Sequence, residues 1–215
     1  MRGQPAFDLT LYLVVGSDAV RGRSVLDVVA AAVRGGVTLV QLREKTMSDA
    51  EVVASARVLV DLLAPLGVPL IINDRVEVAI AAGAAGVHLG QDDLDAARAR
   101  SLLGPDGIVG VSAGTTAEAA IVSAGLSDYV GVGAVYPTTS KADAGAAIGI
   151  AGLEALQARL PLPVVAIGGI HAGNAAEVAA TGVAGVAVVS AICGADDPEE
   201  VARSLRQAIA AGRGV

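Results

Sequence analysis

Several short motifs in this chain of 215 residues contain side chains that bind phosphate or a metal ion. The chain has only two lysines, and they end the motifs QLREK (Lys45) and YPTTSK (Lys141). Two carboxylates stand in the motifs NDR (Asp74) and HLGQDD (Asp93). Lysine neutralises phosphate charge, and Mg²⁺ prefers one or two carboxylates together with phosphate oxygens. The residue types therefore indicate a site for a phosphorylated ligand and a metal ion.

A second set of residues also suits a phosphate group. Its members are Thr138, Thr139, Ser140, Gly169, Val189 and Ser190. The first three carry hydroxyl groups and precede Lys141, and hydroxyl groups donate hydrogen bonds to phosphate oxygens. The other three lie at the end of an expected strand or just after one, where backbone amides can bind an anion.

Several of these residues also fit a purely structural interpretation. Gln41 and Arg43 alternate along an expected strand and could fill the interior of a barrel. A buried arginine without an acidic partner is costly, however, which favours a ligand role for Arg43. Asn73 and Asp74 could cap the helix that follows them, and Asp92 and Asp93 could begin another helix.

No side chain stands out as a covalent catalyst. Cys193 is the only cysteine and is most simply a small buried residue. His88 has apolar and glycine neighbours, so we expect a hydrogen-bonded structural histidine rather than a catalytic one. The pattern favours metal-assisted departure of a diphosphate over covalent catalysis.

A repeating pattern of strand, loop and helix must position these motifs. Apolar and β-branched runs predict eight strands, at 9–15, 37–42, 68–72, 86–89, 108–112, 128–133, 163–167 and 184–189. Ala-rich stretches predict eight helices, at 24–35, 48–65, 75–82, 93–103, 115–124, 150–159, 173–180 and 197–211. Ser48 with Glu51, and Thr115 with Glu118, have the spacing of a capping box at a helix start.

This strict alternation predicts an α/β protein, a single-domain (β/α)8 TIM barrel that spans residues 1–215. A doubly wound open sheet is the alternative, but none of the expected strands has the character of an edge strand. In a TIM barrel, active-site residues lie in the loops that follow the strands. The motifs above fall in those loops, from the second expected strand onward.

The expected fold then groups the side chains into two anion centres. The first combines Arg43, Lys45, Asn73 and Lys141 with a metal ion on Asp74 and Asp93. The second consists of Gly169, Val189 and Ser190, after the seventh and eighth strands, where TIM barrels commonly bind phosphate. A metal ion with two lysines suits a diphosphate better than a monophosphate, because each neutralises part of its charge.

Composition excludes several classes of protein. Hydrophobic residues make up 53% of the chain, which excludes a disordered protein. The 15 basic and 22 acidic residues give a net charge of −7, which argues against nucleic-acid and membrane partners. Residues 178–195 carry no charge, yet they divide into a helix end and a strand instead of forming a membrane span. The N-terminal residues show no apolar run of signal-peptide length, so we expect a cytoplasmic protein.

The motifs resemble those of the thiamine phosphate synthase family over nearly the whole chain. Besides the motifs quoted above, the resemblance rests on GVS at 110–112, IGGI at 167–170 and VSAI at 189–192. Any one motif alone is weak, whereas their order and spacing together are specific. The family condenses hydroxymethylpyrimidine diphosphate with a thiazole phosphate to give thiamine phosphate and pyrophosphate. The resemblance thus implies a Mg²⁺-dependent transferase that works by a dissociative substitution.

The resemblance also implies roles for individual residues. The pyrimidine diphosphate would be held by Gln41, Leu42, Arg43, Glu44, Lys45, Asn73, Ser112 and Lys141. The thiazole phosphate would be held by Thr138, Thr139, Ser140, Gly169, Val189 and Ser190. Mg²⁺ would be bound by Asp74 and Asp93. Catalysis would fall to Arg43, Lys45, Ser112 and Lys141, without a general base, because the thiazole nitrogen is already nucleophilic.

The chain departs from the family pattern at a few positions. Gly114 stands where a histidine is common after GVS, and Ala134 stands where a proline is usual. Ser140 replaces a threonine but keeps its hydroxyl group. We expect function to survive these changes, with the thiazole side of the site most affected by Gly114.

Three other functions fit parts of the pattern. A thiazole tautomerase of the same fold would use a histidine near Gly114 and would need no paired lysines. A non-catalytic barrel that binds thiamine intermediates would not need the carboxylates Asp74 and Asp93. A sugar-phosphate isomerase is supported only by analogy of fold. The sequence does not predict the oligomeric state or the carboxylation state of the thiazole.

Overall fold

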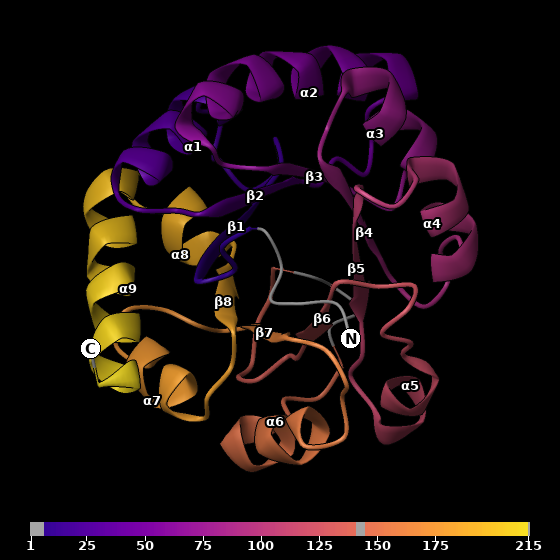
Figure 1. The fold of residues 1–215 in the computed structure, drawn as a ribbon. Coiled ribbons are helices and arrows are strands. Elements are labelled where there is room, and N and C mark those ends of the chain that lie inside the picture. The colour runs from indigo at the N-terminus through magenta and orange to yellow at the C-terminus, as the bar shows by residue number, and fades with distance from the viewer. Residues whose placement is uncertain (1–6, 141–144, 215) are drawn as a thin grey trace.

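The computed structural model describes residues 7–140 and 145–214, and within them the chain forms a closed barrel. Eight parallel strands of the described chain follow one another around the barrel in sequence order, and β8 pairs back with β1. Figure 1 looks along the barrel and shows the helices as a ring outside the strands. This arrangement confirms the predicted (β/α)8 TIM barrel.

The strands are short and lie within or close to their predicted ranges. They are β1 (Leu11–Val15), β2 (Leu39–Leu42), β3 (Leu70–Asn73), β4 (Gly86–Leu89), β5 (Ile108–Ser112), β6 (Tyr129–Val132), β7 (Val164–Ile167) and β8 (Gly185–Val188). Most of their residues are buried, because the barrel interior covers one face and the helices cover the other. This explains why the strands were recognisable as continuous apolar runs.

The helices also follow the predicted order. They are α1 (Val25–Arg34), α2 (Asp49–Leu63), α3 (Val76–Ala82), α4 (Ala96–Leu103), α5 (Thr116–Ile121), α6 (Gly149–Gln157), α7 (Ala175–Ala180), α8 (Ser190–Cys193) and α9 (Pro198–Arg213). A short 3₁₀ helix, Ala64–Leu66, continues α2. The one-turn helix α8, directly after β8, was not predicted.

Local capping interactions fix where the helices begin. Ser48 and Glu51 form the predicted capping box at the start of α2, each side chain bonding the other residue's backbone amide. At α5 only half of the predicted box forms, because Thr115 accepts from the Glu118 amide while the Glu118 carboxylate accepts from Gly114 N at 2.6 Å. Helix α4 begins later than predicted, with Asp95 as its N-cap.

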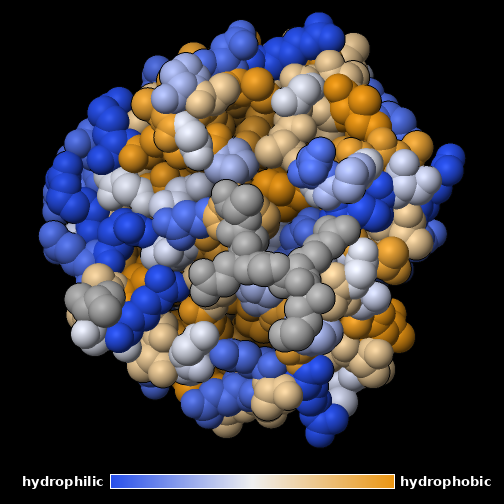
Figure 2. All heavy atoms as spheres, viewed as in Figure 1, coloured by the Kyte–Doolittle hydropathy of each residue, from blue (hydrophilic) through white to orange (hydrophobic). Residues whose placement is uncertain are grey.

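The apolar core has an outer and an inner part. The larger part lies between the strands and the helices, with residues such as Leu13, Val40 and Leu153 fully buried. A smaller cluster fills the barrel interior and includes Tyr12 and Tyr129. Hydrophilic residues gather on the outer rim of the molecule, for example over α9, and hydrophobic residues show further inward (Figure 2).

The register of the strands aligns their C-terminal ends at one face of the barrel. Asn73 at the end of β3 pairs with His88 in β4, and Ser112 at the end of β5 pairs with Gly131 in β6. Side chains that were separate in the sequence motifs therefore meet at this face. In the part of the chain that the structure describes, none of the helices is long and apolar enough to cross a membrane.

Candidate functional site

The first predicted anion centre is assembled at the ends of β2, β3 and β4. The Lys45 ammonium donates to Asp74 Oδ2, and the Asn73 side-chain amide donates to Asp74 Oδ1. The Asp74 carboxyl group also interacts with that of Asp93, which comes from the next strand–helix loop. A lysine, an amide and a second carboxyl group thus all contact Asp74, which brings together residues that the sequence analysis had grouped.

The Asp74 carboxyl group is held in an environment that disfavours its charge. Its pKa is raised, first because burial desolvates the carboxylate and next because Asp93 lies beside it, while Lys45 works in the opposite direction. The Asp74 backbone also adopts φ of 65°, in the left-handed region that residues other than glycine rarely occupy. Backbone strain of this kind clusters at functional sites, because the surrounding structure must stabilise it.

The structural interpretation of these acidic motifs is wrong. The N-cap position of α3 is Arg75, without a side-chain cap, so neither Asn73 nor Asp74 caps that helix. Asp93 does not begin α4, which starts at Ala96. The Asp93 carboxylate instead accepts a hydrogen bond from Gly90 N at 2.7 Å, which orients it within the loop after β4.

Arg75 organises the loop that carries Lys45, a role that sequence reasoning missed. Its guanidinium donates to Met47 O at 2.9 Å and to Glu44 O at 2.9 Å, and it pairs with Asp49 Oδ1 at 3.0 Å. An arginine can span several carbonyl groups because its donors form a planar fork. The arginine of the NDR motif was visible in the sequence, but only the folded chain shows that its hydrogen-bond partners lie in the β2–α2 loop.

Three other residues of the QLREK motif occupy distinct environments. Leu42 is buried in β2, and the Glu44 side chain turns away to accept from Ser17 N at 2.7 Å and Ser17 Oγ at 2.8 Å. Arg43 is half-buried just beyond the strand. Within the described residues its guanidinium has neither a hydrogen bond nor an ion pair, so it remains available to an anion.

Gln41 and Ser112 point into the barrel and take part in side-chain hydrogen bonds there. Gln41 Nε2 donates to the Tyr12 hydroxyl at 2.6 Å, and Ser112 Oγ lies 2.9 Å from His88 Nε2. His88 Nδ1 lies 3.0 Å from the Tyr129 hydroxyl, so both ring nitrogens of His88 are hydrogen-bonded, as expected for a structural histidine. Sequence reasoning missed the two tyrosines.

The second predicted anion centre lies where the loops after β6, β7 and β8 meet. Ser140 Oγ donates to Ser190 Oγ at 3.3 Å, and Ser140 N donates to Thr138 Oγ1 at 3.2 Å. Gly169 has φ of 65°, and a Cβ there would lie 2.7 Å from Pro137 O, so glycine lets the β6 and β7 loops approach.

The remaining residues of this centre are arranged at the surface. Thr139 is exposed, Val189 precedes the first turn of α8, and Ser190 is the first residue of that helix. The structure therefore brings together Thr138, Ser140 and Ser190 through hydrogen bonds, with Gly169 packed against the same loop. Lys141 lies outside the described residues, so its predicted position stays a prediction.

The remaining features outside these centres fit structural roles. Burial raises the pKa of the Cys193 thiol to about 12, so it is not a thiolate nucleophile at neutral pH.

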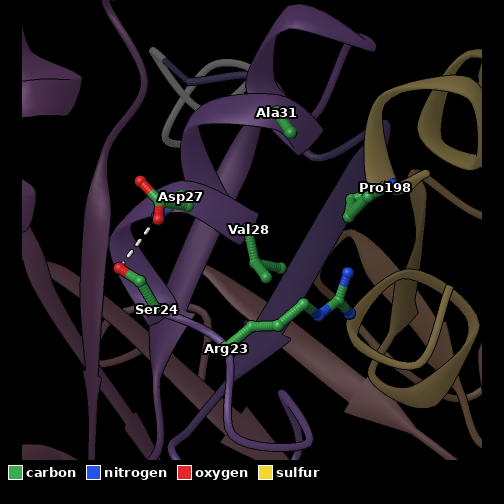
Figure 3. Close-up of a pocket in the computed structure, with 6 residues that line it drawn as sticks. All are labelled: Arg23, Ser24, Asp27, Val28, Ala31 and Pro198. Carbon is green, nitrogen blue, oxygen red and sulfur yellow. Dashed lines mark hydrogen bonds between the residues drawn. The ribbon is translucent and has the colours of Figure 1, made fainter. Parts of the chain in front are cut away.

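A pocket of about 340 Å³ lies on the outside of the barrel between α1 and the start of α9 (Figure 3). Arg23 at its edge donates to Cys193 O at 2.6 Å and Ala195 O at 2.7 Å, so its guanidinium ties chain segments together.

Comparisons with known proteins all find similarity to enzymes of one family. A family model described as thiamine monophosphate synthase matches residues 11–192. A thiamine-phosphate synthase from Azorhizobium caulinodans is 51% identical over 96% of this chain and 98% of its own length. One from Xanthobacter autotrophicus is 54% identical over the same shares. The solved structure of a thiamine phosphate pyrophosphorylase from Pyrococcus furiosus is 35% identical with a TM-score of 0.86, covering 96% of this chain and 98% of that one.

Proposed function

The chain belongs to the thiamine monophosphate synthase family and is a transferase that forms thiamine phosphate, and on this premise we propose its substrates and mechanism. The substrates are hydroxymethylpyrimidine diphosphate and a thiazole phosphate, and the products are thiamine phosphate and pyrophosphate. The observation that carries the proposal is the contact of Lys45 and Asp93 with Asp74 at the C-terminal face of the barrel. With a divalent cation bound to the two carboxyl groups, such a cluster would suit a ligand with the charge of a diphosphate.

The pyrimidine diphosphate is held between the loops after β2, β3 and β5. Lys45 and the uncommitted guanidinium of Arg43 supply positive charge for the diphosphate oxygens, and the predicted position of Lys141 adds a third cation. Gln41 and Ser112, at the barrel mouth, supply polar groups for the ring and the neighbouring oxygens. Asn73 orients the Asp74 carboxylate beside them.

The chemistry of Asp74 and Asp93 fits Mg²⁺. Two adjacent carboxyl groups supply hard oxygen ligands. The pKa of Asp74 is raised first by burial and next by the neighbouring Asp93, and a bound cation would oppose both effects. Within the described residues no cluster of three or more acidic, histidine or cysteine side chains could hold a metal ion. Waters and diphosphate oxygens would complete the coordination, as is usual for Mg²⁺. When bound, Mg²⁺ would neutralise charge on the departing pyrophosphate.

The reaction proceeds by dissociation and recombination. The bond between the pyrimidine methylene carbon and the diphosphate oxygen breaks, and its electron pair leaves with the pyrophosphate. Arg43, Lys45 and Lys141 stabilise that negative charge, which is worth several kcal/mol where water is excluded. The amino group of the pyrimidine ring donates electron density to the methylene cation. The lone pair of the thiazole nitrogen then forms the new carbon–nitrogen bond.

The second anion centre holds the thiazole phosphate for this attack. Ser140 and Ser190 present hydroxyl groups to one point, and Gly169 leaves space for backbone and ligand to approach. The main task of the site is to keep the two rings in contact, because orientation alone can lower the barrier by several kcal/mol. A general base is unnecessary, since the thiazole nitrogen carries no proton to remove.

The proposal is tested by incubating the purified protein with both substrates and Mg²⁺ and measuring thiamine phosphate and pyrophosphate together. We expect equal amounts of both products, and no turnover in EDTA. Lys141→Ala should remove most of the activity, whereas Arg98→Ala, an exposed cation on α4, should not. Binding of both substrates without product would overturn the proposed reaction, and full activity in EDTA would remove the metal ion from it.

A further inference from the structure

A chain of side-chain hydrogen bonds crosses the barrel interior below the mouth of the site. Gln41 Nε2 donates to the Tyr12 hydroxyl at 2.6 Å, and the Tyr12 and Tyr129 hydroxyl groups lie 2.8 Å apart. The Tyr129 hydroxyl lies 3.0 Å from His88 Nδ1, and His88 Nε2 lies 2.9 Å from Ser112 Oγ. Five residues from five strands thus form one continuous path.

The proposed function assigns substrate binding to the two residues at the ends of this path, and it assigns nothing to the three residues between them. Gln41 and Ser112 are expected to hold the pyrimidine diphosphate, whereas Tyr12, Tyr129 and His88 have no assigned role. We propose that Tyr12, Tyr129 and His88 are positioning residues, which fix the Gln41 amide and the Ser112 hydroxyl in matched orientations toward the pyrimidine diphosphate. This inference rests on the proposed function.

Two glycines in neighbouring strands leave room for the side chains of the path. A Cβ at Gly110 would lie 2.2 Å from Tyr129 Cζ and 2.4 Å from its hydroxyl oxygen, so any larger residue would displace the phenol. A Cβ at Gly131 would lie 3.1 Å from His88 Cε1. Two strand positions therefore carry glycine where the rings of the path need space, although glycine weakens a strand.

Burying the tyrosine hydroxyl groups costs free energy unless they form hydrogen bonds, as they do in this path. Tyr12 is 2% exposed and Tyr129 is fully buried, and both rings pack in the apolar cluster of the barrel interior. The rings also pack edge to face, with centroids 5.9 Å apart. Phenylalanine would fill the same space without a polar atom to satisfy, so packing alone does not explain two hydroxyl groups at this depth.

The number of hydroxyl, amide and imidazole protons fixes which residue donates and which accepts in each hydrogen bond of the path. Because Gln41 Nε2 donates to Tyr12, the Tyr12 hydroxyl must donate to Tyr129, since no other acceptor contacts it in the described residues. Tyr129 then donates to His88 Nδ1, and the proton on His88 Nε2 is directed to Ser112 Oγ. The hydrogen of the Ser112 hydroxyl is left to point elsewhere, toward an acceptor on the ligand.

Reversing any member of the path would therefore reverse the rest. If the Gln41 amide were turned by 180°, its carbonyl oxygen would accept from Tyr12, and Ser112 would donate to His88 instead of to the ligand. The tyrosine–histidine relay thus links the amide orientation at one side of the ligand to the hydroxyl orientation at the other. A preset orientation of this kind reduces the reorganisation needed on binding.

The first test replaces the central hydroxyl group. Wild-type protein, Tyr129→Phe and the control Tyr136→Phe are compared in kcat, in KM for each substrate and in thermal unfolding. Tyr136 is a matched control because its hydroxyl donates to Glu177 Oε2 on α7, at 2.8 Å, outside the path. We expect Tyr129→Phe to lower kcat/KM for the pyrimidine diphosphate by about tenfold or more and to leave KM for the thiazole phosphate unchanged.

The outcomes separate this inference from the proposed function. If the wild type forms no thiamine phosphate, both fail. If the wild type is active and Tyr129→Phe has the same kinetic constants, the positioning role is overturned, whatever the shift in melting temperature. Equal effects on the KM of both substrates would also overturn it, because they would indicate general damage to the barrel.

A double-mutant cycle tests whether His88 acts through Ser112. Asparagine at position 88 keeps an amide near the Nδ1 position, and glutamine keeps one near the Nε2 position that faces Ser112. We expect His88→Gln to retain more activity than His88→Asn. We also expect His88→Asn to cost less than about twofold when Ser112 is already alanine. Losses that multiply in the double variant, or a His88→Asn variant as active as His88→Gln, would overturn the proposal.

Discussion

Asp74 and Asp93 come from successive strand–helix loops, and their carboxyl groups interact directly at the ends of β3 and β4. Burial and the neighbouring Asp93 together raise the pKa of Asp74, and the contact with Lys45 offsets only part of this effect. Two ionised carboxylates side by side destabilise the protein without a metal ion. On the proposed function, the same arrangement would increase the affinity for Mg²⁺, so the cost in stability would be linked to metal binding.

The first prediction concerns the removal of one of these charges. Asp93→Asn keeps an oxygen that can accept from Gly90 N but abolishes the repulsion with Asp74. We expect this variant without metal to gain up to about 1 kcal/mol in the free energy of unfolding, because solvent screens the repulsion. We also expect Mg²⁺ to raise the melting temperature of the wild type and not that of the variant.

Asp92→Asn is the matched control, because it removes a neighbouring carboxylate that is exposed. It should leave both the melting temperature and its response to Mg²⁺ unchanged. Thermal unfolding with and without Mg²⁺ measures all of these quantities. A loss of stability in metal-free Asp93→Asn would contradict the repulsion between the two carboxylates.

The second prediction concerns pH. A carboxyl group whose pKa is raised on folding binds a proton more readily in the folded state than in the unfolded state. Asp74 therefore contributes stability at low pH, which is lost as the pH rises through its folded pKa. Mg²⁺ competes with that proton, so its stabilising effect should vanish on acidification at a pH above the ordinary pKa of an aspartate. Melting temperatures across acidic pH, with and without Mg²⁺, measure this; a Mg²⁺ effect constant down to the ordinary aspartate pKa would refute it.

The fold was predictable because each of its units carries the same local signals. The strand β4 matches its predicted range in full, since an apolar run buried on both faces is bounded by a glycine and a polar loop. The start of α2 was equally clear from the Ser48–Glu51 capping box. The one-turn helix α8 was missed because a single turn has too few residues for a periodic pattern.

The site was only partly predictable, for a physical reason. Residues such as Asp74 and Lys45 could be placed together because a parallel barrel puts all strand ends at one face. The contacts of Arg75 with Met47 and of Tyr12 with Tyr129 join positions far apart in sequence. No local pattern encodes such contacts, which depend on the register of the strands and on the space left by glycines.

The third prediction concerns the loop that carries Lys45. Arg75→Lys removes the planar fork that joins Met47 O and Glu44 O, so the loop should become less well ordered. We expect the free energy of unfolding to fall by about 1–2 kcal/mol and kcat/KM for the pyrimidine diphosphate to fall about tenfold. Chemical denaturation and steady-state kinetics measure the two effects.

A control for this change exists on the same helical layer. Arg57 on α2 also donates to a carbonyl oxygen, Ala81 O, at 3.0 Å, but far from the loop. Arg57→Lys should therefore change kcat/KM by less than about twofold. If Arg75→Lys kept wild-type kinetics while losing stability, the loop would not depend on Arg75 for its function.

The last prediction concerns the phosphate of the second substrate. Ser190 receives a hydrogen bond from Ser140 Oγ at 3.3 Å, so the two hydroxyl groups point to one place from opposite loops. Because a hydrogen bond to a charged group contributes about 1.5–3 kcal/mol, Ser190→Ala should raise KM for the thiazole phosphate by about tenfold or more. KM for the pyrimidine diphosphate should stay the same. Ser204→Ala, which removes a hydroxyl group from α9, should change neither value. A rise in KM for the pyrimidine diphosphate alone would assign Ser190 to the other substrate.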